Sequence, residues 1–277
     1  MSLNPKNSVI EFLNEQRGIV KSRTGGWFPG KGVFCHGYSM MDELVGEKSY
    51  FQVLILNATG KMVKRPLADW VEAIYICLSW PDPRIWCNQI GALAGTAGSS
   101  VVAATAAGSL ASDSRTYGVR PLLDGVAFIQ NAMEQKRSGQ SVDSIVDAEC
   151  AKHGGKPHIV GYARPIAKGD ERLEAMERVS EQLNFTEGEH LSLAYAIEKN
   201  LRDRFDEGMN INGYMSAFLS DQGFTAKEVY QMFSLLVMSG VTACYLDTYD
   251  RVPGAFLPQQ CRDMDYQGAQ PRQVPDP

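Results

Sequence analysis

Helical periodicity runs along most of the chain and constrains the fold more than any other feature. Thr225 and Glu228 have the spacing of a capping box, in which each side chain bonds the backbone amide of the other at the start of a helix. Val229, Phe233 and Val237 follow four residues apart and predict one buried helical face. A second box and stripe are predicted at Thr186, Glu189, Leu193, Ile197 and Leu201. This periodicity predicts helices over residues 7–16, 39–46, 49–59, 66–79, 85–111, 119–138, 142–153, 171–183, 188–206, 211–221 and 226–244.

Strand signals are confined to one short segment near the start. Residues 27–34 predict two small strands around the turn Gly30-Lys31-Gly32. Strands and helices do not alternate elsewhere, which disfavours a doubly wound sheet. The sequence therefore predicts an all-α protein with one small β-hairpin.

The segment 85–111 carries no charged residue and is long enough to cross a membrane. It consists mostly of Gly, Ala, Ser and Thr, however, and is only weakly apolar. Small residues allow helix backbones to approach closely. We therefore expect a buried helix that packs tightly on other helices, and no membrane association.

The charge balance and the cysteines exclude several classes of protein. The chain has 27 basic and 32 acidic residues, a net charge of −5, so nucleic-acid binding is not expected. Its six cysteines include no CxxC pair and no zinc-type spacing. No signal peptide is visible in the first residues. We expect a cytoplasmic protein with reduced thiols and no metal site.

Six segments occur in an order that is typical of one superfamily. They lie at 28–44 (with HGYSMMDEL at its end), 49–60, 106–108, 161–172 (GYARPIAKGDER), 210–214 (NINGY) and 271–273 (PRQ). Together they resemble the citrate synthase superfamily, in its short citryl-CoA lyase-like form. The resemblance covers the chain from about residue 26 to its end.

The resemblance implies a helical fold with two domains and a homodimer. The large domain would comprise 1–118 and 223–277 and carry the dimer interface. The small domain, 119–222, would close over the acyl-CoA. The implied substrates are a coenzyme A thioester and a carboxylate, with no permanently bound cofactor.

The catalytic residues of the superfamily are replaced in this chain. In the family an aspartate removes a proton from the acetyl methyl group while two histidines stabilise the developing charges. Asn212 stands where the aspartate is expected, and Arg164 where one histidine is expected. The other histidine positions fall near Asp82 and in the segment 113–118, which contain no histidine. An amide has no basic lone pair, and loss of a general base alone costs about 10²- to 10⁴-fold in rate.

The candidate site residues follow from these correspondences. The candidates for catalysis are Arg164, Asn212, Asp82 and Tyr117. Those for coenzyme A binding are Lys156, Val160, Gly161, Tyr162 and Lys168, and those for carboxylate binding are Arg115, Arg172 and Arg272, since arginine binds carboxylates in bidentate fashion.

Each of these candidates also has a purely structural interpretation. Arg164 and Arg172 could be surface residues paired with Asp170 and Glu171. Asn212 could cap a helix. Tyr117 could belong to the core, and Asp82, between two prolines, to a turn.

Three functions remain open on the sequence alone. The first is a family enzyme with a rewired site, acting as an acyltransferase or lyase. The second is a catalytically inactive homologue that binds coenzyme A or citrate. The third is an ordinary family enzyme whose site residues lie elsewhere in the chain. The four histidines, none in a family-like context, count against the third.

Overall fold

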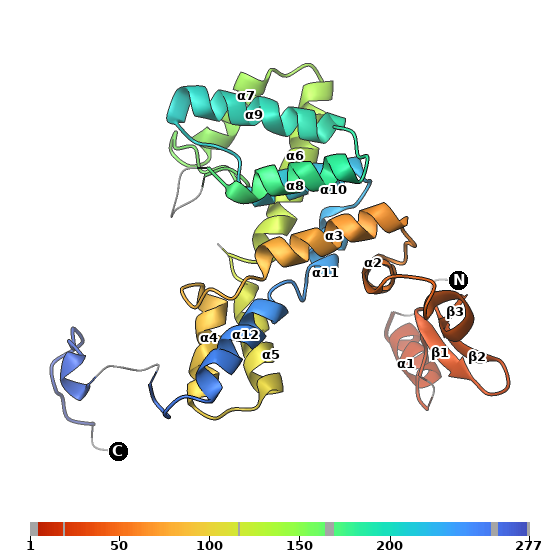
Figure 1. Cartoon of the computed structure of the whole chain (residues 1–277), viewed down its shortest axis with the longest axis horizontal. Coiled ribbons are helices and arrows are strands. Elements are labelled where there is room, and N and C mark those ends of the chain that lie inside the picture. Colours follow the sequence, from red (N-terminus) through yellow and green to blue (C-terminus); the bar gives the residue numbers. More distant parts are fainter. Residues whose placement is uncertain (1–4, 19, 116, 164–168, 256–259, 276–277) are drawn as a thin grey trace. The chain divides into compact units, whose positions relative to one another are not determined.

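The computed structural model describes residues 5–18, 20–115, 117–163, 169–255 and 260–275. These residues form a mostly helical protein with one small sheet, as predicted (Figure 1). They divide into two compact units. Unit 1 comprises Met1–Cys77 and Ser114–Ser234, and unit 2 comprises Leu78–Asp113 and Leu235–Pro277. The domain boundaries implied by the resemblance, at 119 and 222, stay a prediction.

Unit 1 contains the sheet and most of the helices. Its elements are α1 (Pro5–Glu15), β1 (Gly25–Phe28), β2 (Gly32–Cys35), β3 (Tyr38–Ser39), the π-helical turn η1 (Met40–Leu44), α2 (Tyr50–Thr59), α3 (Arg65–Leu78, whose last residue belongs to unit 2), α6 (Arg120–Arg137), α7 (Val142–Ala151), α8 (Glu171–Gln182), α9 (Glu189–Phe205), α10 (Ile211–Asp221) and α11 (Ala226–Met232). Unit 2 contains α4 (Trp86–Thr96), α5 (Val101–Ser112), α12 (Met238–Tyr249) and the short 3₁₀ turn η2 (Cys261–Asp263).

The predicted hairpin is confirmed. Strands β1 and β2 pair antiparallel with Gly25 opposite Cys35 and Phe28 opposite Gly32. A third strand, β3, pairs with β2 and leads directly into η1. The side chain of Ser39 accepts from the Asp42 amide at the start of η1, as expected for a cap.

The core of unit 1 is built around Trp70. Its ring stacks on Phe218 of α10 with the centroids 3.9 Å apart, and its indole N–H donates to the Ser180 hydroxyl at 2.9 Å. The predicted stripe Leu193, Ile197 and Leu201 is fully buried in the same unit. Helix α10 is therefore fixed on one side by α3 and on another by α8.

One of the two predicted capping boxes is confirmed and the other is wrong. Thr225 and Glu228 form the box at the start of α11. Helix α9 begins instead after Gly188, and the carboxylate of Asp221 accepts from the amides of His190 and Leu191, at 2.9 Å and 3.0 Å. A methyl group on Gly188 would overlap the Asp221 carboxylate, so glycine leaves the space for a cap that comes from another helix.

The small-residue segment forms two helices and not the single predicted one. The chain turns at Gly98, whose φ is +71°, and Ser100 caps the new helix α5 by accepting from the Ala103 amide. Helices α4, α5 and α12 lie side by side (Figure 1). A methyl group on Gly91 would lie 2.7 Å from the Val241 carbonyl oxygen, and one on Gly108 would lie 2.5 Å from Val241 Cγ1. The predicted close packing of small residues is confirmed.

The predicted helix 226–244 is also two helices, because the chain between Met232 and Met238 forms turns. Its stripe residues Val229, Phe233 and Val237 are nevertheless all buried. Among the described helices, none is both long and apolar enough to span a membrane.

Candidate functional site

The turn around Gly161 packs directly on the first turn of α10. Gly161 has φ +89°, which favours glycine, and a methyl group there would lie 2.7 Å from the Gly213 Cα. A methyl group on Gly213 would overlap the carbonyl oxygen of Gly161 and would lie 2.8 Å from the Met209 side chain. Both glycines are therefore needed for this backbone-to-backbone contact.

Asn210 joins the same two segments by hydrogen bonds. Its backbone amide donates to the Gly161 carbonyl at 3.0 Å, and its side-chain amide donates to the Ala163 carbonyl at 2.7 Å. The side-chain oxygen of Asn210 caps α10 by accepting from the Asn212 amide at 2.9 Å. The asparagine at 210 thus holds the turn and starts the helix at once.

A buried ion pair fixes the beginning of α8 next to the beginning of α10. The Arg172 guanidinium donates two bonds of 2.7 Å to the Asp170 carboxylate, from Nε and from Nη2. The second carboxylate oxygen also accepts from the Ile211 backbone amide at 2.9 Å. The side chain of Asp170 is fully buried, whereas 19% of the Arg172 side chain is exposed. The predicted alternative, an exposed surface pair, is wrong for these two residues.

The charge of Asp170 is stabilised by these donors. Burial alone would raise the pKa of the Asp170 carboxyl, but the bonds from Arg172 and from the Ile211 amide outweigh it and hold the pKa below its ordinary value. The pair therefore stays ionised at neutral pH, with Arg172 presented at the start of α8.

The side chain of Asn212 is engaged in packing against α6. Its amide nitrogen donates to the Pro121 carbonyl at 2.8 Å, and its oxygen accepts from the Ser216 hydroxyl at 3.0 Å. A methyl group on Gly125 of α6 would lie 2.7 Å from that oxygen. The predicted alternative, in which Asn212 caps a helix, is wrong because Asn210 is the cap.

We expect Asn212→Asp to destabilise the protein at neutral pH. A carboxylate cannot donate to the Pro121 carbonyl and would face its oxygen at the present 2.8 Å, so the free energy of unfolding should fall by about 1–3 kcal/mol. The loss should shrink as the pH falls and the introduced carboxyl becomes protonated. Urea denaturation at pH 7 and pH 5 measures both effects. Asn131→Asp is the matched control, since the oxygen of the exposed Asn131 only accepts a bond from Gln135.

The candidates for coenzyme A binding occupy different environments along one segment. Lys156 is exposed and Val160 is half-buried. Tyr162 is buried, donates to the Ala194 carbonyl at 3.1 Å, and contacts Phe128 edge-on. Burial raises the pKa of the Tyr162 hydroxyl above its ordinary value. Tyr162 thus anchors the turn through its side chain, and Gly161 contributes backbone alone.

Arg115 and Tyr117 lie in a tight turn before α6. The Ser114 hydroxyl donates to the Tyr117 carbonyl at 3.0 Å, which closes the turn. Arg115 is exposed and 36% of Tyr117 is exposed, so Tyr117 is not a core residue.

Asp82 and Arg272 belong to unit 2. The carboxylate of Asp82 is held by its near neighbour Arg84, with Nη2 to Oδ2 at 2.7 Å. The side-chain and backbone bonds from Arg84 lower the pKa of Asp82 to about 2, which makes it a poor base at neutral pH. Its predicted place in a turn fits this geometry, and Arg272 is exposed. Arg164 and Lys168 lie outside the described residues.

The structure thus brings together the turn at 160–162, Asn212 and the first residues of α8 and α10 within unit 1. Asn210 and the buried role of Asp170 were not predicted. An Asn or Asp placed immediately before a helical stripe is the signal that indicates such caps.

No protein-family model and no curated protein matches the sequence. The structure, however, is similar to citryl-CoA lyase from Hydrogenobacter thermophilus, with a TM-score of 0.76 and 22% identity over 93% of this chain and 98% of that chain. The chain has a citrate synthase-like fold.

Two larger proteins share this fold. An ATP citrate lyase from Methanothrix soehngenii, solved with citrate and coenzyme A, gives a TM-score of 0.75 at 16% identity over 98% of this chain and 45% of its own length. The citrate synthase from Thermotoga maritima MSB8 gives 0.62 at 15% identity over 82% of this chain and 60% of its own. These identities establish the fold, and the chemistry has to be argued from the residues of this chain.

Proposed function

We propose that this protein acts on an acyl-CoA and a polycarboxylate by forming or cleaving a carbon–carbon bond, as a citrate synthase- or citryl-CoA lyase-type enzyme with a rewired site. The observation that supports this most is the Asp170–Arg172 pair, which is tied to the start of α10 beside the Gly161–Gly213 contact. Coenzyme A would enter as a thioester substrate and not as a resident cofactor.

The roles follow from charge and position. Arg172, held by a buried carboxylate, would bind a substrate carboxylate with its remaining exposed surface. The turn at Val160 and Gly161, with the exposed Lys156 just before it, would take the coenzyme A moiety. Arg115, Tyr117, Arg164, Lys168 and Arg272 are the further positive or hydrogen-bonding groups proposed for the substrates.

A second function is favoured by the geometry of Asn212 and Asp82. Both polar ends of the Asn212 amide are used in packing, and the low pKa of Asp82 makes it a poor base. A protein with these two residues could bind coenzyme A and a polycarboxylate without turnover. The second candidate is therefore a catalytically inactive binding or regulatory homologue.

An activity assay in both directions distinguishes the two candidates. Cleavage of citryl-CoA is followed by oxaloacetate formation, and condensation of acetyl-CoA with oxaloacetate by thiol release. The proposed enzyme yields product in at least one direction, and Arg172→Lys lowers the rate because a lysine cannot keep the bidentate pair. A folded protein that binds these ligands but gives no product in either direction supports the binding homologue.

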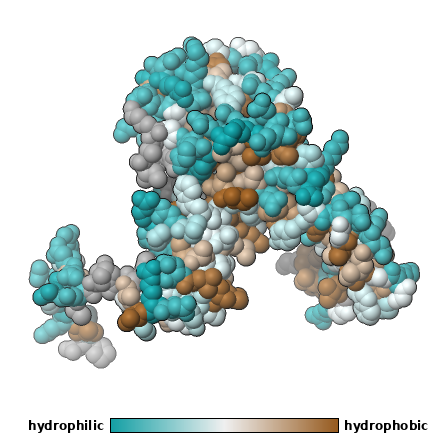
Figure 2. Space-filling view, viewed as in Figure 1, coloured by the Kyte–Doolittle hydropathy of each residue, from teal (hydrophilic) through white to brown (hydrophobic). Residues whose placement is uncertain are grey.

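We also propose that the protein is a homodimer through unit 2. Helix α5 exposes two apolar side chains eight residues apart, Val102 at 75% and Leu110 at 79%. Figure 2 shows apolar side chains gathered on the visible face over α5 and α12. Exposed apolar surface of this kind is typical of an interaction site.

We expect Leu110→Asp to weaken the dimer. A charge in a buried apolar interface should raise the dissociation constant by at least about tenfold. Sedimentation velocity over a range of concentrations measures it. Val252→Asp is the matched control, because Val252 is 76% exposed but lies beyond the end of α12. Equal sedimentation of wild type and Leu110→Asp at all concentrations would contradict this interface.

A further inference from the structure

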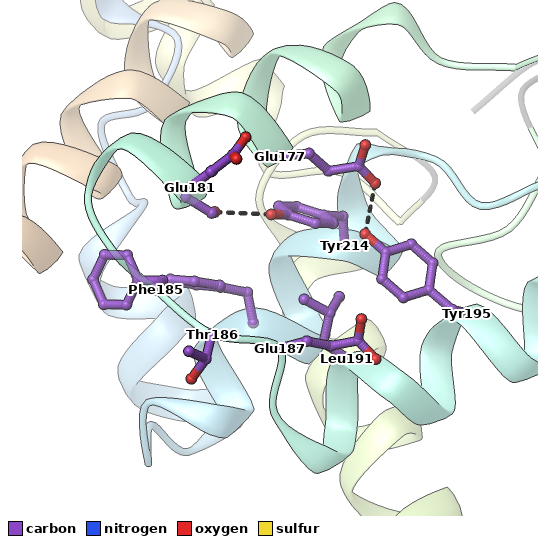
Figure 3. A pocket seen from close by; sticks show the side chains of 10 residues that line it. Glu177, Glu181, Phe185, Thr186, Glu187, Leu191, Tyr195 and Tyr214 are labelled. Carbon is purple, nitrogen blue, oxygen red and sulfur yellow. Dashed lines mark hydrogen bonds between the residues drawn. The ribbon is translucent and has the colours of Figure 1, made fainter.

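Unit 1 contains a cavity of about 220 Å³ between α8, α9 and α10. None of the residues proposed above for catalysis, coenzyme A or carboxylate binding lines it. Figure 3 shows Tyr195 and Tyr214 on two different helices, with their side chains directed into the same space, and Leu191 beside them. The cavity is therefore separate from the site already described.

The inner wall is aromatic and held in place by bonds from the core. The Tyr214 hydroxyl lies 2.9 Å from the Ser180 hydroxyl, which also accepts from Trp70. Phe218 lies between the Trp70 ring, on which it stacks, and Phe185, which it contacts edge-on at 5.0 Å. Such a wall needs little rearrangement to receive a ligand.

The exposed rim is acidic. Glu177 and Glu181 of α8 and Glu187, just before α9, line the cavity, and none of the described lining residues is basic. Glu177 accepts from the Tyr195 hydroxyl at 2.6 Å and Glu187 from the Ser192 hydroxyl. These partners are neutral, so the negative charge at the rim is not compensated by them.

We propose that this cavity binds an alkylammonium or alkylguanidinium group, with the cation between the rim carboxylates and the tyrosine rings and the alkyl stem against Leu191 and Phe218. Aromatic faces attract cations, and carboxylates supply the opposite charge. Cavities for drug-sized ligands measure about 300–1,000 Å³, so this smaller one fits a group the size of a single side chain. Such a group could come from a free amine or from a basic residue of a peptide.

Calorimetric titration with butylguanidinium, and with the neutral isostere butylurea, tests the charge requirement. The cation should bind at least about tenfold more tightly than the urea, because the urea lacks the charge that the rim and rings attract. Equal binding of the two, or no binding of the cation, would overturn the proposal.

Variants test the location. Glu181→Gln together with Glu187→Gln removes two rim charges from exposed positions and should weaken butylguanidinium binding at least about fivefold. Glu134→Gln, an exposed substitution on α6 outside the lining, should leave it unchanged. Unchanged affinity in the double variant would overturn the proposal, and its thermal unfolding confirms that the variant is folded.

A capped arginine, N-acetylarginine amide, distinguishes the two sources. Binding as tight as that of butylguanidinium identifies a peptide side chain as the ligand, and binding at least about tenfold weaker identifies a free amine. Both results require the cation to bind. The titrations contain neither coenzyme A nor a carboxylate substrate, so the proposal stands or fails independently of the proposed function.

Discussion

Replacing Asp170 by asparagine lowers the free energy of unfolding by about 3 kcal/mol at neutral pH in our account, because it leaves the Arg172 guanidinium buried without its counter-charge. An amide oxygen can still accept one bond, but its NH₂ group would face a second donor. Urea denaturation measures the change. Asp124→Asn, an exposed substitution on α6, is the matched control and should change stability by less than about 0.5 kcal/mol.

The same variant should flatten the acid side of the stability curve. The pKa of Asp170 is lowered in the folded protein, so its stabilisation is fully present above its ordinary pKa of about 3.9 and is lost as the pH falls through the folded value. Between about pH 5 and pH 3, wild type should therefore lose stability more steeply than Asp170→Asn. Parallel pH profiles would show that the pair is not ionised as the geometry indicates.

Gly213→Ala should cost about as much, for a different reason. The added methyl group overlaps the Gly161 carbonyl oxygen and crowds Met209, so the turn has to move away from α10. Overpacking of this kind costs about 1–3 kcal/mol. The free energy of unfolding should fall by that amount, and coenzyme A binding should be lost with the displaced turn.

Gly208→Ala separates this contact from a general effect of removing a glycine. A methyl group on Gly208 would lie 3.4 Å from the Glu198 carboxylate, an ordinary contact, so stability and ligand binding should stay close to wild type. If both alanine variants unfold at the same urea concentration as wild type, the Gly161–Gly213 contact does not position the turn.

Much of the fold could be predicted from local pattern. Helix stripes and the Thr225 box identify helices because their signal lies within the helix itself. The break at Gly98 was missed, since a small-residue run has no periodicity to interrupt. The cap of α9 was missed for another reason. Its acceptor, Asp221, lies in α10, and no local pattern indicates a partner so distant in the chain.

The site was predictable to a similar degree. Order and spacing of the motifs located Gly161, Arg172 and Asn212, which unit 1 does bring together with its helix starts. The environment of each side chain was not predictable. Arg172 reads as a surface residue in the sequence, and it is buried against Asp170 only because α8 and α10 begin side by side.

The measurement that tests the central claim most directly is calorimetric titration of the purified protein with coenzyme A, with and without citrate. Our account predicts saturable binding of coenzyme A that is weakened in Lys156→Ala and abolished in Gly213→Ala, with Gly208→Ala close to wild type. If coenzyme A and acetyl-CoA give no binding to the folded protein, alone or with citrate or oxaloacetate, the protein shares the fold of citryl-CoA lyase without sharing its ligands.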